Sequence, residues 1–301
     1  MRLRASRIVL PFIGLHAALG WPAAASVCAA GDPPEVLRVE WTRADRSALD
    51  APDAVSAQMT GISFGARLWR RSDEPSSGTG RTLRLFHDYR AYDIPTTAAP
   101  LETNGHLHRL GVSFDDKRES WEWSVAPLLA ASSNVGRHPK VIDRDVVAWH
   151  GMVRRSHHVD RTVTAYWGAC RDDRLGRLRL VPVVGVHWDL DRFDIAIGFP
   201  DSGLTWRAHP RWSVHLRAHP AGGSWRTFSD DLERSSQFRQ AGWRLGVGVG
   251  FQVTANHRLT ATAAREVRRS FRFRLDDGRD VRADAQDVWR FGLRLSWTNA
   301  R

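Results

Sequence analysis

The chain has 301 residues, a formal net charge of +11 and only 2 cysteines. This length suits one large all-β domain or two small ones. The basic excess is almost entirely arginine, because lysine occurs only at Lys117 and Lys140, and it suits nucleic acid, an anionic surface or an anion pathway. No stretch of about 18 apolar residues follows residue 30, which excludes transmembrane helices.

Residues 1–30 have the pattern of a secretory signal peptide. Three arginines precede an apolar stretch at residues 8–21, and small residues suited to cleavage follow at 23–25 and at 28–30. A buried N-terminal helix and lipidation at Cys28 are the alternatives. We predict a signal peptide at 1–30 and one domain at 31–301, exported to the bacterial envelope, which argues against nucleic acid. Only Cys170 then remains with certainty, which leaves no disulfide framework and no thiolate metal site.

The first predicted elements alternate apolar and polar residues at spacing two, with no helical periodicity. In chain order, we expect strands at residues 36–42, 62–68, 83–90, 107–114, 121–129, 146–155 and 162–169. Polar loops and turns separate them. The charged turn at 115–119 predicts that the strands on either side of it form a hairpin.

From residue 176 the predicted elements are shorter, at 177–188, 193–199, 204–209, 212–219 and 225–228. The clearest pattern of the chain is at 239–251, where an apolar ladder from Trp243 to Phe251 alternates with Arg244 and glycines. A strand that crosses a bilayer needs about 9 to 11 residues and carries aromatics at both interfaces. Strands at 258–275 and 289–297 complete the chain, and the last repeats the ladder.

Two folds share this alternation, a soluble periplasmic β-sandwich and a transmembrane β-barrel. Polar faces rich in arginine and small residues, a strong final strand and tryptophans at the ends of ladders favour the barrel. We therefore predict an all-β, antiparallel up-and-down transmembrane barrel of about 12 strands, within a range of about 10 to 16. The predicted interface aromatics are Trp121, Trp167, Trp188, Trp243, Phe251, Trp289 and Trp297.

Residues 179–227 resemble an uncharacterised family of bacterial outer-membrane β-barrel proteins, a domain of unknown function. The matching residues are Pro182, Gly185, residues 198–200, the hairpin at 206–212 and residues 222–225, with weaker likeness over 57–297. The resemblance implies an outer-membrane location, with membrane lipids and the barrel assembly machinery as partners. The chain departs from the usual terminal Phe, since it ends in TNAR after Trp297. No active site is established for the family, so no functional residue follows from it.

Arginines on the polar faces are the leading candidates for function. A pore ringed with arginine favours small anions, because the field in a narrow lumen concentrates them. The alternative is that these arginines pair with Asp88, Glu122, Asp194 or Glu266 and fill a closed lumen. The predicted lumen-lining residues are Arg84, Arg90, Arg207, Arg217, Arg244, Arg272, Arg274, Arg290 and Arg294.

Histidine pairs and serines give weaker signals. His106 and His108 share one strand face, as do His215 and His219, but metal binding needs three or four convergent ligands, so no metal or cofactor is predicted. Ser156 beside His157 lacks a nucleophile-elbow motif. The predicted function is a passive channel favouring small anionic solutes. The alternatives are a closed structural or adhesive barrel and, third, a lipid-modifying enzyme with its serine site on the outer rim.

Overall fold

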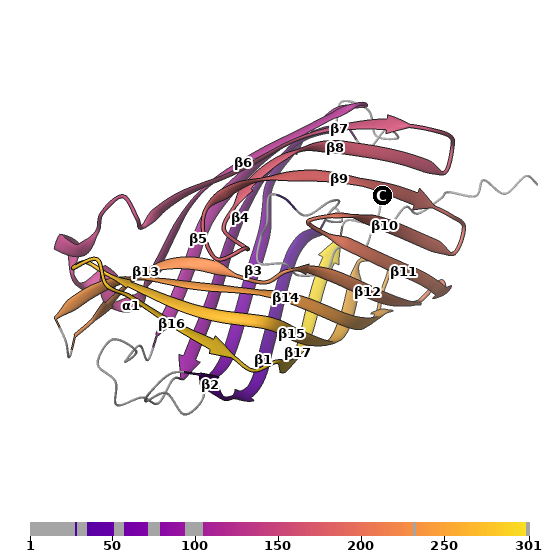
Figure 1. Cartoon of the computed structure of the whole chain (residues 1–301). Helices are drawn as coiled ribbons and strands as arrows, with labels where there is room; N and C mark the ends of the chain where they lie inside the picture. Colours follow the sequence, from indigo (N-terminus) through magenta and orange to yellow (C-terminus); the bar gives the residue numbers. More distant parts are fainter. Residues whose placement is uncertain are drawn as a thin grey trace, which may run out of the picture.

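The computed structural model describes residue 28 and residues 35–50, 57–71, 79–93, 105–230 and 233–298. Its strands form a single sheet that closes on itself as a barrel (Figure 1). The first strand pairs with the last, with Leu37 opposite Trp297. This closure confirms the predicted antiparallel barrel and excludes the two-sheet sandwich.

Fourteen antiparallel strands form the ring, which lies within the predicted range and is two more than the expected number. They are β1 (Glu35–Ser47), β3 (Ala57–Arg71), β4 (Gly80–Asp93), β5 (His106–Lys117), β6 (Trp121–Ser132), β7 (Val147–His158), β8 (Val163–Asp172), β9 (Arg179–Asp189), β10 (Phe193–Phe199), β11 (Ser202–His209), β12 (Trp212–Pro220), β14 (Arg234–Gln252), β15 (His257–Leu275) and β17 (Val288–Thr298). We call the end where β1 begins and β17 stops the terminal end, and the opposite end the distal end.

Three further strands lie at the distal end. They are β2 (Leu49–Asp50), β13 (Gly223–Ser229) and β16 (Asp280–Ala285). β13 pairs with the first half of β14, and β16 pairs with the second half of β15 and with β2. These strands and the two halves that they flank form what we call the distal sheet, which projects beyond the ring (Figure 1).

β13 also meets the opposite wall. One parallel pair joins Arg226 of β13 to Ala131 of β6. The loop after β6 holds α1 (Ser133–Arg137) and the 3-10 turn η1 (Pro139–Val141), and α1 lies beside β13. None of the helices described has the length and apolarity to span a membrane.

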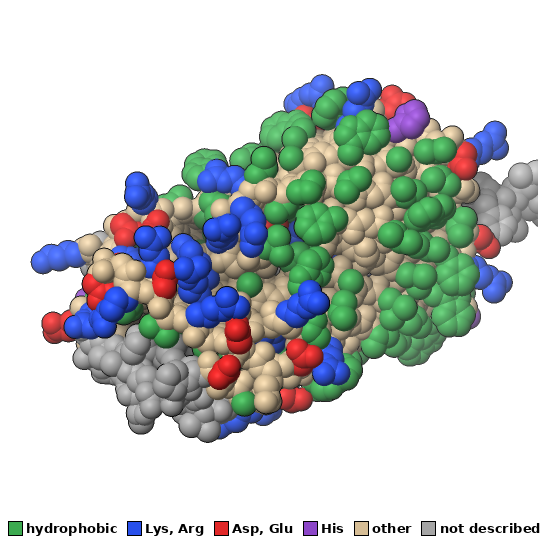
Figure 2. All heavy atoms as spheres, viewed as in Figure 1, with side chains coloured by type: hydrophobic (Ala, Val, Ile, Leu, Met, Phe, Trp, Pro, Cys, Tyr) green, Lys and Arg blue, Asp and Glu red, His purple; other side chains and the backbone are tan. Residues whose placement is uncertain are grey.

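The outer wall carries the apolar residues of each ladder. Leu245, Val247 and Val249 of β14 and Leu293 and Leu295 of β17 are 40–51% exposed. Figure 2 shows apolar side chains covering the part of the molecule towards the terminal end, whereas charged side chains gather towards the distal sheet. A soluble monomer rarely exposes so large an apolar surface, so this band is suited to lipid.

All seven predicted interface aromatics are exposed or half-buried, and most lie at strand ends. Trp121, Trp188, Phe251 and Trp297 are near the terminal end, while Trp243 and Trp289 mark the distal edge of the band. Trp167 instead lies inside β8. Two rows of aromatic residues are the arrangement typical of membrane interfaces.

A β-bulge in β15 changes which residues face inward. Ala241 pairs with Ser270 but Trp243 pairs with Val267, so β15 has one extra residue there, and Arg268 has a positive φ of 51°. An extra residue moves every following side chain to the other face. Phe271 and Phe273 are therefore buried, whereas Arg272 and Arg274 are exposed.

The predicted lumen positions of Arg272 and Arg274 are accordingly wrong. Strict alternation along 258–275 would place them inside, and the bulge at Arg268 is the physical reason that they lie outside.

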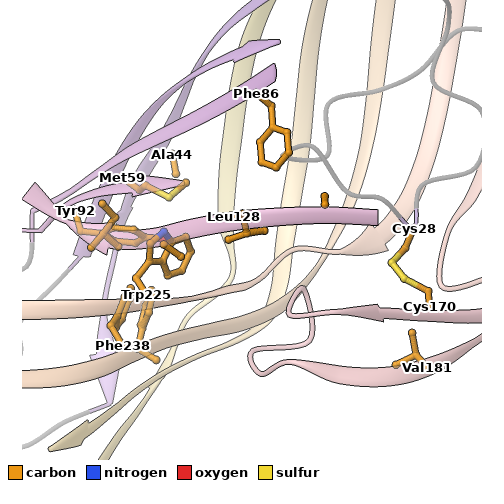
Figure 3. Close-up of a cluster of buried hydrophobic side chains, with 14 of the residues drawn as sticks. Cys28, Ala44, Met59, Phe86, Tyr92, Leu128, Cys170, Val181, Trp225 and Phe238 are labelled. Atoms are coloured by element: carbon orange, nitrogen blue, oxygen red, sulfur yellow. A yellow bond between two sulfur atoms is a disulfide. The ribbon is translucent and has the colours of Figure 1, made fainter. Parts of the chain in front are cut away.

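An aromatic core fills the barrel at the distal end (Figure 3). Trp225, Phe238, Phe271 and Phe273 of the distal sheet are 0–2% exposed. They pack with side chains of β3, β4 and β5, and the Tyr92 and Phe238 rings meet edge to face at 5.5 Å. The distal sheet is thus held against the wall by apolar burial as well as by hydrogen bonds.

A disulfide joins Cys28 to Cys170 on the inner face of β8 (Figure 3). The expectation of a single remaining cysteine is therefore wrong. It followed from placing the end of the signal peptide after Cys28, the residue that the disulfide joins to β8. The proposed signal peptide itself lies outside the described residues, Cys28 excepted.

Candidate functional site in the barrel lumen

The candidate site begins where β13 crosses towards β6. Gly222 precedes the strand and Gly223 is its first residue. A Cβ at either would collide, with the Arg174 carbonyl at Gly222 and with the Trp225 ring at Gly223. Only glycine allows this close approach of the chain. Two guanidinium groups contact the Trp225 ring, with Arg109 at 4.4 Å and Arg90 at 5.0 Å from the ring centroid. Both contacts have cation-π geometry.

Asp173, in the loop after β8, fixes the start of β13. It accepts hydrogen bonds from Arg109 at 2.5 Å and from the backbone N–H of Ser224 at 2.9 Å, and His150 Nε2 lies 3.4 Å from its other oxygen. Burial alone would raise the pKa of Asp173, but Arg109, His150 and the Ser224 amide together hold that pKa well below its ordinary value. The carboxylate therefore stays ionised inside the barrel.

Arg174, the next residue of the loop, bridges two carboxylates. Its Nε donates to Asp172 at 2.6 Å and its Nη1 to Asp201 at 3.0 Å. Burial would lower the pKa of Arg174, yet Asp201 and Asp172 raise it above the ordinary value. Asp201 directly follows residues 198–200, at the end of β10. The segments at 198–200 and 222–225 that carry the family resemblance therefore converge on this one loop.

A second cluster lies between these contacts and the terminal end, around Glu266 on the inner wall. Its carboxylate is contacted by Arg244 at 2.6 Å, Arg290 at 3.2 Å and Arg269 at 3.6 Å. Glu266 is 1% exposed, so three arginines share one buried carboxylate. Next to it a cavity of about 20 Å³, lined by Arg244, Arg290, Glu40 and His219 among others, has room for a single water molecule.

Towards the terminal end the inner wall is more open. Arg84 lies 3.8 Å from Asp115, and Arg207 lies 3.3 Å from Asp189 and 3.6 Å from Asp194. These side chains are 23–36% exposed, unlike the Glu266 cluster. The lumen therefore narrows from a charged vestibule at the terminal end to the filled distal end.

Seven of the nine predicted lumen arginines lie on the inner face, and each is within 4.0 Å of a carboxylate. They are Arg84, Arg90, Arg207, Arg217, Arg244, Arg290 and Arg294. Asp88, Asp194 and Glu266 are partners as the alternative expected, whereas Glu122 pairs with Arg154.

Sequence reasoning missed the groups that hold β13. The inward position of Arg109 could have been predicted, because this residue lies between the outward-facing His108 and Leu110 on β5. Asp173 and Arg174 had none, since they lie in a loop where periodicity carries no information.

Two of the inner-face histidines, His215 and His219, are hydrogen-bonded to neighbouring groups. His215 contacts Ser213 at 2.8 Å and Thr205 at 3.1 Å, and His219 contacts the Pro220 carbonyl at 2.8 Å. Among the residues that the structure describes, the one group with metal-ligand spacing is Cys28, Cys170 and Asp172, and its two sulfurs are bonded to each other.

No protein-family model matches the chain, so the family resemblance gains no support from one. No curated protein matches it either. Among solved structures, the chain is similar to the NanC porin (TM-score 0.37, 9% identity, 87% of this chain and 100% of that chain) and to the β domain of the Bordetella autotransporter BrkA (0.33, 11%, 88% and 100%). It is also similar to the toluene transporter TodX of Pseudomonas putida (0.27, 9%, 86% and 88%). At these scores the likeness carries no functional inference, and the barrel is established by its own strand pairings.

Proposed function

We propose that this protein is a bacterial outer-membrane β-barrel that passes small anionic solutes. The observation that carries the proposal is the excess of arginine on the inner wall, most evident where Arg244, Arg269 and Arg290 surround the single carboxylate of Glu266. In a lumen walled by low-dielectric protein, such an excess raises the local concentration of anions. The apolar outer band and its aromatic edges support the membrane location.

The path for a solute is narrow. Trp225 and Phe238 fill the distal end between β13 and the β3–β5 wall, and the Glu266 cluster leaves room for only one water molecule beside it. We therefore expect a small conductance that excludes bulky solutes.

A closed barrel of structural function is the second candidate. It is favoured by the same distal core and by the pairing of the inner-face arginines with carboxylates. The two candidates differ in whether any continuous aqueous path exists.

Conductance in a planar bilayer under a salt gradient separates the two candidates. The refolded protein is first checked for barrel closure by its heat-modifiable mobility on a gel. We expect small discrete steps with an anion-selective reversal potential. A folded, heat-modifiable protein without steps would establish the closed barrel instead.

A charge variant tests the role of the lumen arginines. Replacing Arg244 and Arg294 with Ser removes two positive charges from the inner wall. The reversal potential should therefore move towards zero, the value for a channel that does not discriminate between anions and cations. The matched control replaces Arg272 and Arg274 with Ser, the same change of charge on the exposed distal sheet, and should leave selectivity unchanged. Equal shifts in both variants would attribute selectivity to overall charge rather than to the lumen.

A further inference from the structure

A chain of hydrogen-bonded side chains lies on the outer wall of β4 and β5, where these strands reach the distal end. His87 comes from β4, His108 from β5, and Ser133 is the first residue of α1. Their strand neighbours Asp88, Leu107 and Arg109 are buried on the inner side, so the two histidines face outward. The next outward residue of β5 towards the terminal end is Leu110, which is 46% exposed. The group therefore borders the apolar band.

The three side chains are connected in one order. Ser133 Oγ lies 2.8 Å from His108 Nε2, and His108 Nδ1 lies 3.1 Å from His87 Nε2. The two imidazole rings are nearly parallel, with centroids 5.4 Å apart. The Ser133 hydroxyl also lies near the His106 carbonyl, which is farther away at 3.4 Å.

This order determines which atom must carry each proton in the series of hydrogen bonds. When Ser133 donates its hydroxyl proton to His108 Nε2, His108 carries its own proton on Nδ1 and donates it to His87 Nε2. A serine joined to a histidine that a third group orients is the arrangement of nucleophilic acyl-transfer sites, which are recognised by geometry rather than by sequence order. In this chain a second imidazole occupies the place of the usual carboxylate.

We propose that Ser133, His108 and His87 form a second site, independent of the lumen, that hydrolyses carboxylic esters of membrane lipids. Ser133 Oγ attacks the ester carbonyl carbon while His108 Nε2 takes the hydroxyl proton. His108 then returns that proton to the departing alcohol oxygen as the ester C–O bond breaks. His108 then takes a proton from water, whose oxygen attacks the acyl carbon. The bond from that carbon to Ser133 Oγ breaks, His108 returns the proton to Oγ, and the carboxylic acid is released.

The position of the site selects the substrate class. A lipid in the band next to Leu110 places its acyl chains against apolar wall and its ester groups at the polar edge, which is the level of His108. The Tyr89 ring lies 5.1 Å from the His108 ring, and its hydroxyl contacts His106 Nδ1 at 2.5 Å. Tyr89 and His106 therefore form one side of the site. His87 touches no substrate in this scheme and acts by positioning His108.

A fluorophosphonate probe tests the nucleophile directly. The full-length refolded barrel in detergent micelles is treated with the probe, and the modified residue is located by mass spectrometry. We expect an adduct on Ser133, none in Ser133→Ala, and hydrolysis of a short-chain p-nitrophenyl ester and of a phospholipid that Ser133→Ala abolishes. Ser156→Ala, which removes the serine beside His157, is the matched control and should react as the unmodified chain does.

Two histidine variants test the chain of hydrogen bonds. Loss of the general base in His108→Ala should slow ester turnover by about 10²- to 10⁴-fold. His87→Asn should lower kcat with little change in KM and shift the acid limb of the pH–rate profile, an effect that a purely structural role would not produce.

Barrel closure in every variant is checked by heat-modifiable mobility. Absence of a Ser133 adduct on the folded protein, or labelling that His108→Ala leaves at its original rate, would overturn the proposal.

Discussion

At the scale of single residues, the pKa of Asp173 predicts a pH dependence. Its folded pKa is held below the ordinary value of 3.8 by Arg109, His150 and the Ser224 amide. A depressed carboxyl pKa stabilises the fold above the unfolded pKa, and this contribution is lost as the pH falls through the folded value. We expect Asp173→Asn to lower the urea midpoint of the refolded barrel above about pH 4, and the gap to the unmodified protein to narrow as the pH falls further.

The control for this prediction is Asp191→Asn, which removes the same charge from an exposed turn. Its midpoint should follow the unmodified protein at every pH. If the difference in urea midpoint between Asp173→Asn and the unmodified protein stays constant from pH 7 to pH 2, ionisation of Asp173 does not contribute to stability. The substitution then acts through packing or lost hydrogen bonds instead.

At the scale of elements, the bulge in β15 decides which face of the distal sheet is apolar. Arg268 holds a left-handed backbone conformation that costs about 1 to 3 kcal/mol for a residue other than glycine. Arg268→Gly should therefore raise the free energy of unfolding by up to about 1 kcal/mol. Deleting Arg268 should instead turn Phe271 and Phe273 outward and abolish heat-modifiable mobility.

The two outcomes are measured on the same gel and by the same urea titration. A deletion variant that still closes normally would show that the register after the bulge is set by the turn at residues 276–279 rather than by the extra residue.

The strands also show how much of the candidate site the apolar alternation of the sequence can predict. Alternation correctly separates inner from outer residues wherever the strand is regular, as for Arg244 between Trp243 and Leu245. It fails beyond Arg268, because a bulge leaves no mark in the apolar pattern. Alternation also does not show which residues contact each other. The Ser133–His108 contact joins residues 25 apart, and it depends on how the loop after β6 lies against β5.

At the scale of the whole molecule, the sequence predicts a barrel but not what occupies it. The segment that becomes β13 has the same short alternation as its neighbours in the ring, and no pattern states that it leaves the ring to cross towards β6. The difference arises from long-range pairing, such as Arg226 with Ala131. The expected strand number is too low for a related reason, since segments as short as the 7 residues of β10 still take a place in the ring.

Trp225 should be the residue that most limits the opening of the distal end. Trp225→Ala removes a fully buried side chain, and such a truncation costs about 3 to 5 kcal/mol. We expect a lower urea midpoint together with a larger single-channel conductance in planar bilayers.

Trp167→Ala, on the outer wall, is the matched control and should leave conductance unchanged. Conductance that is identical in Trp225→Ala and the unmodified protein would show that the core around Trp225 does not limit the path.

The bond between Cys28 and Cys170 constrains how the precursor is matured. Cleavage after Ala30 would discard Cys28 and leave Cys170 as a lone thiol, whereas cleavage after Ala25 keeps both sulfurs on one polypeptide. If the predicted signal peptide is removed, we expect the cut at the first of the two small-residue segments, because only that cut keeps the bridge. The bridge would then form after export, where an oxidant acts on the chain, and would fasten Cys28 covalently to β8.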